Sequence, residues 1–148
     1  MIFVLIIFVV LSADLMIKKY MESKLAPGEE KPILHGRVIL RKYHNKGFCL
    51  GIGKEQPRKV LWVSGAVILL VLINFIVELF RKGRHIKKIG MALLLGGAFC
   101  NWFDRLHQGY VTDYFSIKTK IRKIRKLVFN LSDFCILIGT LLCFFSEK

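Results

Sequence analysis

The hydrophobic residues of this chain gather in four long runs, at about residues 1–17, 60–80, 89–106 and 127–145. A soluble helix would show its apolar residues as a periodic stripe, whereas continuous apolar runs are typical of segments that face lipid. The second run fits the roughly 20 residues that cross about 30 Å of hydrocarbon. The pattern therefore predicts one all-α integral membrane domain with four transmembrane helices, so that both termini lie on the same side.

The first run allows a second interpretation, as the apolar core of a cleavable signal over Met1 to Ala13. No Lys or Arg precedes it and no small-x-small cleavage site follows it, so we expect a transmembrane helix.

The longest connection, about residues 18–59, is too long for a simple turn, so we expect it to be structured. Its early part, Ala26 to Pro32, is rich in turn residues, whereas Ile33 to Tyr43 is rich in β-forming residues. We expect one or two short strands here, which form a small β-containing loop region outside the membrane.

Composition and charge agree with a membrane protein. The chain is 54% hydrophobic, with a mean hydropathy of +0.49, which is too apolar for an ordinary soluble domain. Its net charge of +14 suggests nucleic-acid binding at first, but all 24 basic residues lie outside the apolar cores of the runs. There they can meet lipid headgroups. We expect no nucleic acid, and membrane lipid as a partner, with the densest basic cluster at residues 118–126.

The distribution of Lys and Arg favours an orientation with the termini outside the cytoplasm. One side carries 18 of these residues, against five in the connection 81–88 plus Lys148 on the other, and cytoplasmic loops are usually the more basic ones. The long first connection holds 11 of the 18, which weakens the argument.

The four cysteines do not indicate a disulfide framework or a metal site. Cys100, Cys135 and Cys143 fall inside the runs and only Cys49 lies in a loop. The chain has no Cys-x-x-Cys pair with a nearby His, so no zinc site and no cofactor are expected.

Four acids are candidates for chemistry because charge within a membrane segment is costly. Alternation of the helices places Asp14, Asp104, Asp113 and Asp133 at one face of the membrane and Glu78 at the other. Two aspartates that share a site cannot easily both ionise, so one stays protonated while the other is charged. The charged one can take a proton from water and the protonated one can polarise a carbonyl, which is the chemistry of an aspartic peptidase and needs no metal.

Spacing alone does not decide which two acids form the pair. Asp104 lies on one helical face with Asn101 and has the cation of Arg105 beside it. Asp113 and Asp133 have no such neighbour, which makes them the better candidates for a coupled pair. Alternatively, all these acids only form ion pairs with loop lysines.

The chain also resembles a known family. Residues 96–115, Gly-Gly-Ala-Phe-Cys-Asn-Trp-Phe-Asp-Arg-Leu-His-Gln-Gly-Tyr-Val-Thr-Asp-Tyr-Phe, are similar to the lipoprotein signal peptidase (signal peptidase II) pattern of paired glycines, Asn-x-x-Asp-Arg and Gly-x-Val-x-Asp-Phe. Residues 129–133 resemble its Phe-Asn-x-Ala-Asp. The stretches 14–18 and 45–47 resemble its Asp-x-x-x-Lys and Asn-x-Gly.

The resemblance implies an endopeptidase that removes the signal peptide of a diacylglyceryl-modified prolipoprotein just before the lipidated cysteine. It implies a bacterial inner-membrane enzyme, working as a monomer, with cytoplasmic termini and a site at the extracytoplasmic face. It implies three sets of site residues: the catalytic pair Asp113 and Asp133; the substrate-binding or site-ordering residues Asn45, Gly47, Asn101, Arg105 and Asn130; and the supporting residues Asp14, Lys18 and Asp104.

The chain departs from the family pattern at several positions. Phe48-Cys49-Leu50 replaces small residues followed by an aromatic, Cys100 replaces a common glycine, and Ser132 replaces an alanine. The departures in the loop can reshape the substrate groove.

Two other functions fit the size of the chain and its number of apolar runs: a small proton-coupled multidrug-type transporter, with Asp14 as the proton carrier, and a non-catalytic membrane adaptor. Neither accounts for a long structured first connection or for two acids with asparagine companions.

Overall fold

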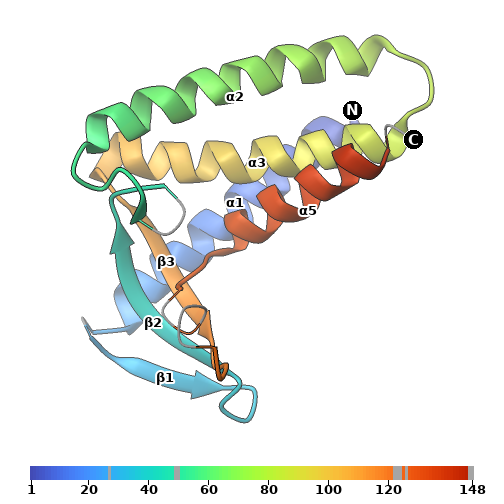
Figure 1. Ribbon diagram of the computed structural model, residues 1–148. Helices are drawn as coiled ribbons and strands as arrows, with labels where there is room; N and C mark the ends of the chain where they lie inside the picture. The colour runs from blue at the N-terminus through green and yellow to red at the C-terminus, as the bar shows by residue number, and fades with distance from the viewer. Residues whose placement is uncertain (27, 49–50, 122–124, 126, 147–148) are drawn as a thin grey trace.

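Four long helices and one small sheet make up the described part of the protein (Figure 1). The computed structural model describes residues 1–26, 28–48, 51–121, 125 and 127–146. The elements are α1 (Ile2–Lys24), β1 (Glu30–Ile33), β2 (Val38–Asn45), α2 (Pro57–Phe80), α3 (His85–Gln108), β3 (Val111–Ile117) and α5 (Leu131–Phe145). Both termini lie at the end of the bundle far from the sheet, as four alternating helices require.

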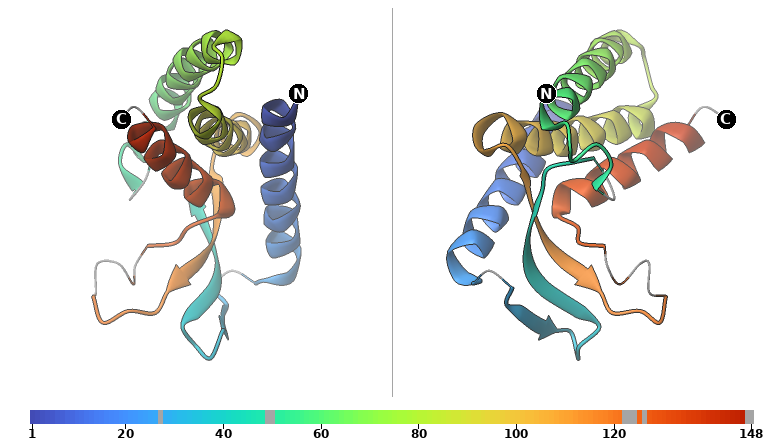
Figure 2. Two further views of the ribbon diagram at one scale, coloured as in Figure 1. Left: turned by 90° about the vertical axis from the view of Figure 1, so that its right-hand side faces the viewer. Right: turned by 60° about the vertical axis from the view of Figure 1, so that its left-hand side comes forward.

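Helix α3 is the central helix and packs against α1, α2 and α5 (Figure 2). Glycines allow two of these contacts to be close. A Cβ atom on Gly97 would lie 2.5 Å from the carbonyl oxygen of Ser132 in α5, and one on Gly96 would lie 3.0 Å from Val10 in α1. The paired glycines therefore let α1 and α5 approach α3 side by side, as small residues commonly do between membrane helices.

The sheet has the order β1-β2-β3, with both pairs antiparallel. Strand β2 falls within the predicted β-forming stretch Ile33 to Tyr43 and runs two residues beyond it, whereas β1 lies mostly in the preceding segment, which was interpreted as turn-rich. Strand β3 was not predicted; the basic cluster at residues 118–126 is the feature that the sequence of the connection after α3 shows most clearly. Through β3 the sheet joins the first connection to the third, so residues from both meet at the end of the bundle nearest the sheet.

Two helix boundaries differ from the expected runs. Helix α1 continues past residue 17 to Lys24, because Lys18 turns inward and is only 4% exposed. Helix α5 begins at Leu131 rather than at 127, because Asn130 caps it. The apolar run predicted the body of each helix, while polar contacts decide where it begins or ends.

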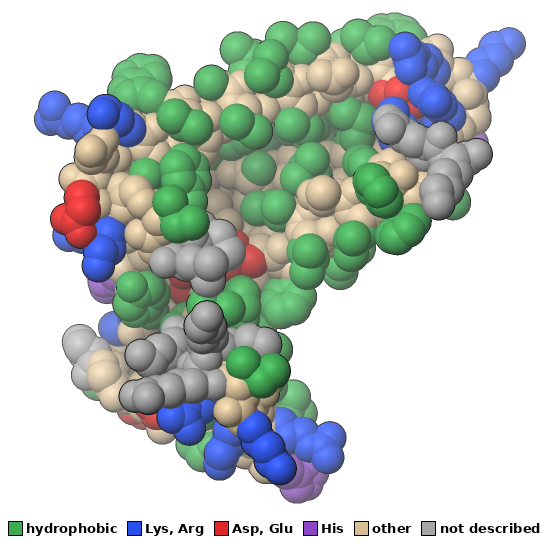
Figure 3. Space-filling model, in the orientation of Figure 1, with side chains coloured by type: hydrophobic (Ala, Val, Ile, Leu, Met, Phe, Trp, Pro, Cys, Tyr) green, Lys and Arg blue, Asp and Glu red, His purple; other side chains and the backbone are tan. Residues whose placement is uncertain are grey.

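The sides of the helices are strongly apolar, and Figure 3 shows hydrophobic side chains spread along them with most charged side chains at the ends and over the sheet. Large exposed residues include Phe8 in α1, and Trp62 and Leu70 in α2. By length and composition, α2 is the one helix of the described chain able to cross a membrane, with a mean hydropathy of 2.7 over its best 18 residues. Helix α5 is apolar but shorter, with 15 residues.

Charged residues at the other end of α2 form a separate cluster. Glu78 is buried and pairs with Arg84 at 3.2 Å and with Arg81 at 3.4 Å. This end lies near the chain termini, away from the sheet, as expected for Glu78. Of the basic cluster at 118–126, Arg122, Lys123 and Lys126 lie outside the described residues.

Candidate active site

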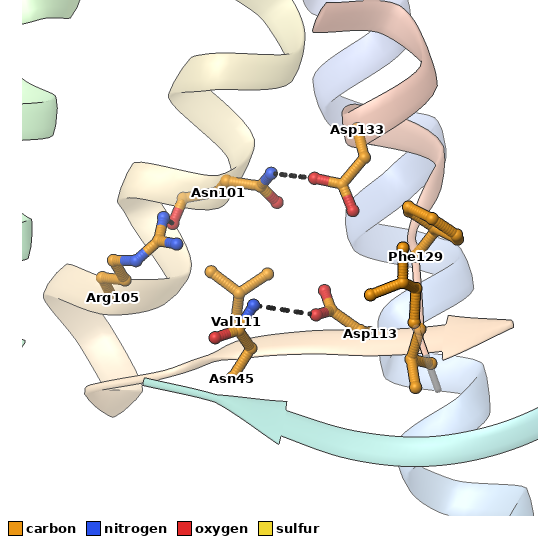
Figure 4. A pocket seen from close by; sticks show the side chains of 9 residues that line it. Asn45, Asn101, Arg105, Val111, Asp113, Phe129 and Asp133 are labelled. Carbon is orange, nitrogen blue, oxygen red and sulfur yellow. Dashed lines mark hydrogen bonds between the residues drawn. The ribbon is translucent and has the colours of Figure 1, made fainter. Parts of the chain in front are cut away.

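A small cavity lies where the sheet meets α3 and the beginning of α5 (Figure 4). Its volume is about 50 Å³, more than the roughly 10–15 Å³ that one water molecule needs. Polar groups from four different segments line it, together with apolar residues of β3 and of the chain before α5: Asn45, Asn101, Arg105, Val111, Asp113, Leu127, Val128, Phe129 and Asp133. The cavity therefore brings together both expected catalytic acids and three of the expected binding residues.

Asp113 is held on β3 with its carboxyl group toward the cavity. It is 3% exposed. Its Oδ2 accepts a hydrogen bond from Nδ2 of Asn45 at 3.1 Å, and its Oδ1 accepts one from Nδ2 of Asn130 at 2.7 Å. Two amide donors from different segments thus fix the orientation of this carboxyl group.

Asp133 is held by the cap of α5. The side chain of Asn130 accepts from the backbone N–H of Asp133 at 2.9 Å, and Oδ2 of Asp133 accepts from the backbone N–H of Asn130 at 3.1 Å. This reciprocal arrangement is a capping box. The other carboxyl oxygen, Oδ1, accepts from Nδ2 of Asn101 at 3.0 Å and faces the cavity.

The two acids are connected through amide side chains. Asn130 donates to Asp113 and caps the helix that carries Asp133, and its Nδ2 also lies 3.2 Å from Oδ1 of Asn101. Asn101 in turn donates to Asp133 and accepts from Nζ of Lys18 at 2.9 Å. One continuous network therefore fixes both carboxyl groups relative to each other.

Burial and charge change the acidity of Asp113. Burial, with the nearby negative charge of Asp133, raises the pKa of Asp113 to about 7, against the opposing effect of the hydrogen bonds from Asn45 and Asn130. A carboxyl group with this pKa holds its proton for part of the time at neutral pH. This is the condition that general acid chemistry by a carboxyl group requires.

Arg105 and Gly47 form one wall of the site. The guanidinium group of Arg105 donates to the carbonyl oxygen of Gly47 at 2.6 Å and to that of Asn101 at 3.0 Å. A Cβ atom on Gly47 would lie 2.6 Å from the backbone of residues 51 and 52, so only glycine fits here. Arg105 therefore ties the loop after β2 to α3. Cys49 and Leu50, which depart from the family pattern, lie outside the described residues.

The expected supporting residues lie directly behind the cavity. Lys18 contacts Asp14 at 2.9 Å and Asp104 at 2.8 Å, and all three side chains are buried. The expected partner of Asp104 was the adjacent Arg105, which is wrong: neighbours on a helix point in different directions. The cation of Lys18 comes from α1 instead.

Several contributors to this region were not expected from sequence. Tyr114, Cys100 and Ser132 all contact Asp14, and Thr112, next to Asp113, donates to Glu22 at 2.8 Å. A signal for the segment around Asp113 was present in its run of β-branched and aromatic residues. In the described part of the chain, no three His, Cys, Asp or Glu side chains are grouped so that they could hold a metal ion.

Comparison with known proteins identifies the family. The family model for signal peptidase (SPase) II matches residues 6–147. The chain belongs to the signal peptidase II family. The lipoprotein signal peptidase of Clostridium acetobutylicum is 32% identical over 141 residues, which cover 94% of this chain and 88% of that protein. The lipoprotein signal peptidase of Fusobacterium nucleatum is 31% identical over 153 residues, 100% of this chain and 90% of the relative.

Solved structures support the same fold. A bacterial membrane enzyme solved by the in meso method at 2.3 Å resolution has a TM-score of 0.82 at 19% identity, over 98% of this chain and 86% of that one. A second, at 1.9 Å resolution, has a TM-score of 0.79 at 21% identity, over 98% and 91%. Membership of the signal peptidase II family, with this fold, makes the chain a bacterial membrane protein and a peptidase. The transporter alternative has no support.

Proposed function

We propose that this signal peptidase II family member is an aspartic endopeptidase in which Asp113 and Asp133 act as the catalytic pair. Family membership supports removal of signal peptides from prolipoproteins. The observation that carries the aspartic mechanism is that both carboxyl groups line one cavity and share the Asn130 side chain and cap.

In this mechanism a water molecule in the cavity attacks the carbonyl carbon of the scissile bond. The charged carboxylate accepts the proton of the water, and the protonated carboxyl group donates a hydrogen bond to the carbonyl oxygen. Because the pKa of Asp113 is about 7, Asp113 is the better candidate to carry the proton at neutral pH. The carboxyl group that took the proton of the water then passes it to the nitrogen of the leaving amine as the C–N bond breaks. One acid is again charged and the other protonated, as before the reaction.

The surrounding residues have proposed roles that follow from their contacts. Asn45, Asn101 and Asn130 orient the two acids, and Arg105 with Gly47 shapes the wall against which substrate backbone lies. Lys18, Asp14 and Asp104 support the site from behind. The substrate proposed for this site is a prolipoprotein with a diacylglyceryl-modified cysteine, cleaved just before that cysteine.

The decisive experiment is cleavage of a diacylglyceryl-modified prolipoprotein by the full-length protein, purified in detergent. We expect Asp113→Asn and Asp133→Asn each to abolish cleavage, while Glu30→Gln, an exposed acid on β1, leaves it unchanged. Full activity in either Asn variant would refute the pair. Thermal unfolding in the same detergent confirms that an inactive variant is folded.

All four helices are proposed to span the membrane, with cytoplasmic termini and the sheet at the extracytoplasmic face. The apolar sides of the bundle and the location of both termini at one end support this arrangement. A reporter fused to the C-terminus that is fluorescent only in the cytoplasm should be fluorescent. A dark but expressed fusion would reverse the orientation.

The basic sheet region is further proposed to contact anionic lipid headgroups, and the protein to act as a monomer. The charge of the chain supports the lipid contact. Activity that rises with the anionic lipid content of proteoliposomes, and a monomeric mass in detergent, are the expected results.

A further inference from the structure

Asp14 is a fully buried carboxylate that contacts three segments of the active site. Its Oδ1 accepts from the hydroxyl group of Tyr114 at 2.9 Å, and its Oδ2 accepts from the hydroxyl group of Ser132 at 2.5 Å and from the thiol of Cys100 at 3.4 Å. Asp14 itself does not line the cavity.

Each of these three donors is the sequence neighbour of a residue that does line the cavity. Tyr114 follows Asp113, Ser132 precedes Asp133, and Cys100 precedes Asn101. A shift of any donor toward or away from Asp14 must therefore move its neighbour in the cavity.

Tyr114 makes the most informative of these contacts. Side chains alternate along a strand, so Asp113 faces the cavity while Tyr114 points to the other side of β3. Its hydroxyl group donates to Asp14 and also accepts from the backbone N–H of Leu131, the first residue of α5, at 2.9 Å. Burial raises the pKa of Tyr114 above its ordinary value, so the hydroxyl group keeps its proton. The hydroxyl bridge thus connects α1, β3 and α5.

Two of these donors stand at positions given above as departures from the family pattern: Cys100 replaces a common glycine, and Ser132 replaces an alanine. Neither glycine nor alanine supplies a side-chain donor. In this chain both positions supply one, and with Tyr114 all three donors contact the same carboxylate. A buried carboxyl group needs hydrogen-bond partners in place of water, so the three donors satisfy one physical requirement together.

We propose that Tyr114, Ser132 and Cys100 form one positioning unit around Asp14, which fixes the separation of Asp113 and Asp133. Tyr114 is its principal member, because its hydroxyl group links the strand that carries one acid to the helix that carries the other. This inference rests on the proposed function, in which these two acids react with the substrate.

The first test compares Tyr114→Phe with wild type, as full-length protein in detergent acting on a diacylglyceryl-modified prolipoprotein. We expect kcat to fall about tenfold, since small displacements of catalytic groups are costly, with KM within about twofold because no substrate contact is lost. Tyr43→Phe, which changes an exposed tyrosine on β2, should leave both constants unchanged.

A positioning role also predicts a change that lost stability does not cause. Two interacting carboxyl groups titrate as a pair, and their repulsion separates the two limbs of a bell-shaped pH–rate profile. If the acids move apart, the limbs move closer together. A narrower profile in Tyr114→Phe supports the proposal. The proposal would be overturned if Tyr114→Phe left both the pH–rate profile and kcat unchanged. It would also be overturned if the variant lost activity but regained all of it when the assay was cooled below the temperature range of unfolding.

The second test asks whether the donors form one unit. Ser132→Ala restores the residue of the family pattern and should fold. The kcat loss of the double variant Tyr114→Phe with Ser132→Ala should differ from the product of the single losses, because both changes act through Asp14. Multiplicative losses would show independent residues. Wild-type cleavage that Asp113→Asn abolishes establishes the proposed function separately, so the two ideas can fail independently.

Discussion

Asn130 donates from its side chain to Oδ1 of Asp113 over 2.7 Å and accepts, with the same side chain, from the backbone N–H of Asp133 over 2.9 Å. One amide therefore aligns a strand residue and the first turn of a helix. The side chain of Asn130 has two functions that mutation can separate. Its amide oxygen caps the helix, and its amide nitrogen donates to Asp113.

Replacing Asn130 by Ser and by Ala should separate these functions. Serine is also a good helix cap, whereas alanine is not, so Asn130→Ala should be less stable than Asn130→Ser by about 1 kcal/mol. Both lack the amide N–H group that donates to Asp113, and the shorter serine side chain does not replace it, so both should lose about 10²-fold in kcat, as when one preorganised donor is removed. Thermal unfolding and steady-state cleavage measure the two effects. Wild-type activity in Asn130→Ser would contradict the role of the amide nitrogen.

The raised pKa of Asp113 predicts a pH dependence of stability. The folded protein holds this proton up to about pH 7, whereas an unfolded chain releases it near pH 4. The folded state binds more protons between these values, so stability falls as pH rises through this range, by at most about 1.4 kcal/mol per pH unit. The Asp113→Asn variant lacks this carboxyl group, so its stability should not show this part of the pH dependence.

The measurement is the unfolding temperature of wild type and Asp113→Asn at pH 4.5, 6 and 7.5. The difference between them should grow in favour of Asp113→Asn as pH rises, and level off above about pH 7. Titratable groups far from Asp113 affect both proteins equally. Parallel curves would rule out the raised pKa.

Lys18 should be among the most important residues for stability. Its ammonium group compensates two buried carboxylates, those of Asp14 and Asp104. Lys18→Met leaves both without a cation, which should cost about 3–5 kcal/mol, measured by thermal or denaturant unfolding in detergent. Lys19→Met, at the adjacent exposed position, is the matched control. Adding Asp104→Asn to Lys18→Met removes one uncompensated charge and should recover part of the loss.

Gly97 should not tolerate alanine. The added Cβ atom would lie 2.5 Å from the carbonyl oxygen of Ser132, so α3 and α5 must separate beside Asp133. We expect a loss of about 1–3 kcal/mol and reduced cleavage. At Gly65 the nearest atom is Nε1 of the Trp102 side chain, at 3.0 Å. That ring can shift, so Gly65→Ala should be milder. If Gly97→Ala and Gly65→Ala lost the same stability, the close backbone contact would not be the reason that position 97 needs glycine.

The sequence predicts the four helices well because each contains a long apolar run, and it predicts β2 from its β-forming residues. It does not predict most of β1, whose residues Glu30 to Pro32 indicate a turn and become a strand only by pairing with β2. It does not reveal β3 by alternation. Val111, Thr112, Asp113 and Tyr114 are all buried, because both faces of this strand are covered. Its polar residues make specific contacts on either side, so the usual two-residue period is absent.

The candidate site was only partly predictable for a similar reason. Motifs indicated the acids and asparagines, but ion-pair partners depend on which helix faces which. Lys18 and Asp104 are far apart in sequence and meet only because α1 packs against α3. Arg105, the nearest cation in sequence, turns toward Gly47 instead. Pairings of this kind require the packed structure.

The contact between Asp14 and Ser132 joins residues 118 positions apart, and it has a consequence for biogenesis. During synthesis α1 is made before α3 and α5, so Lys18 meets Asp104 only after α3 has been made, and Asp14 meets Ser132 only after α5 has begun. Such long-range contacts form late and slowly. A nascent chain without α5 also lacks Asn130 and Asp133. In the proposed mechanism a nascent chain therefore gains activity only after residues 130–133 have been made.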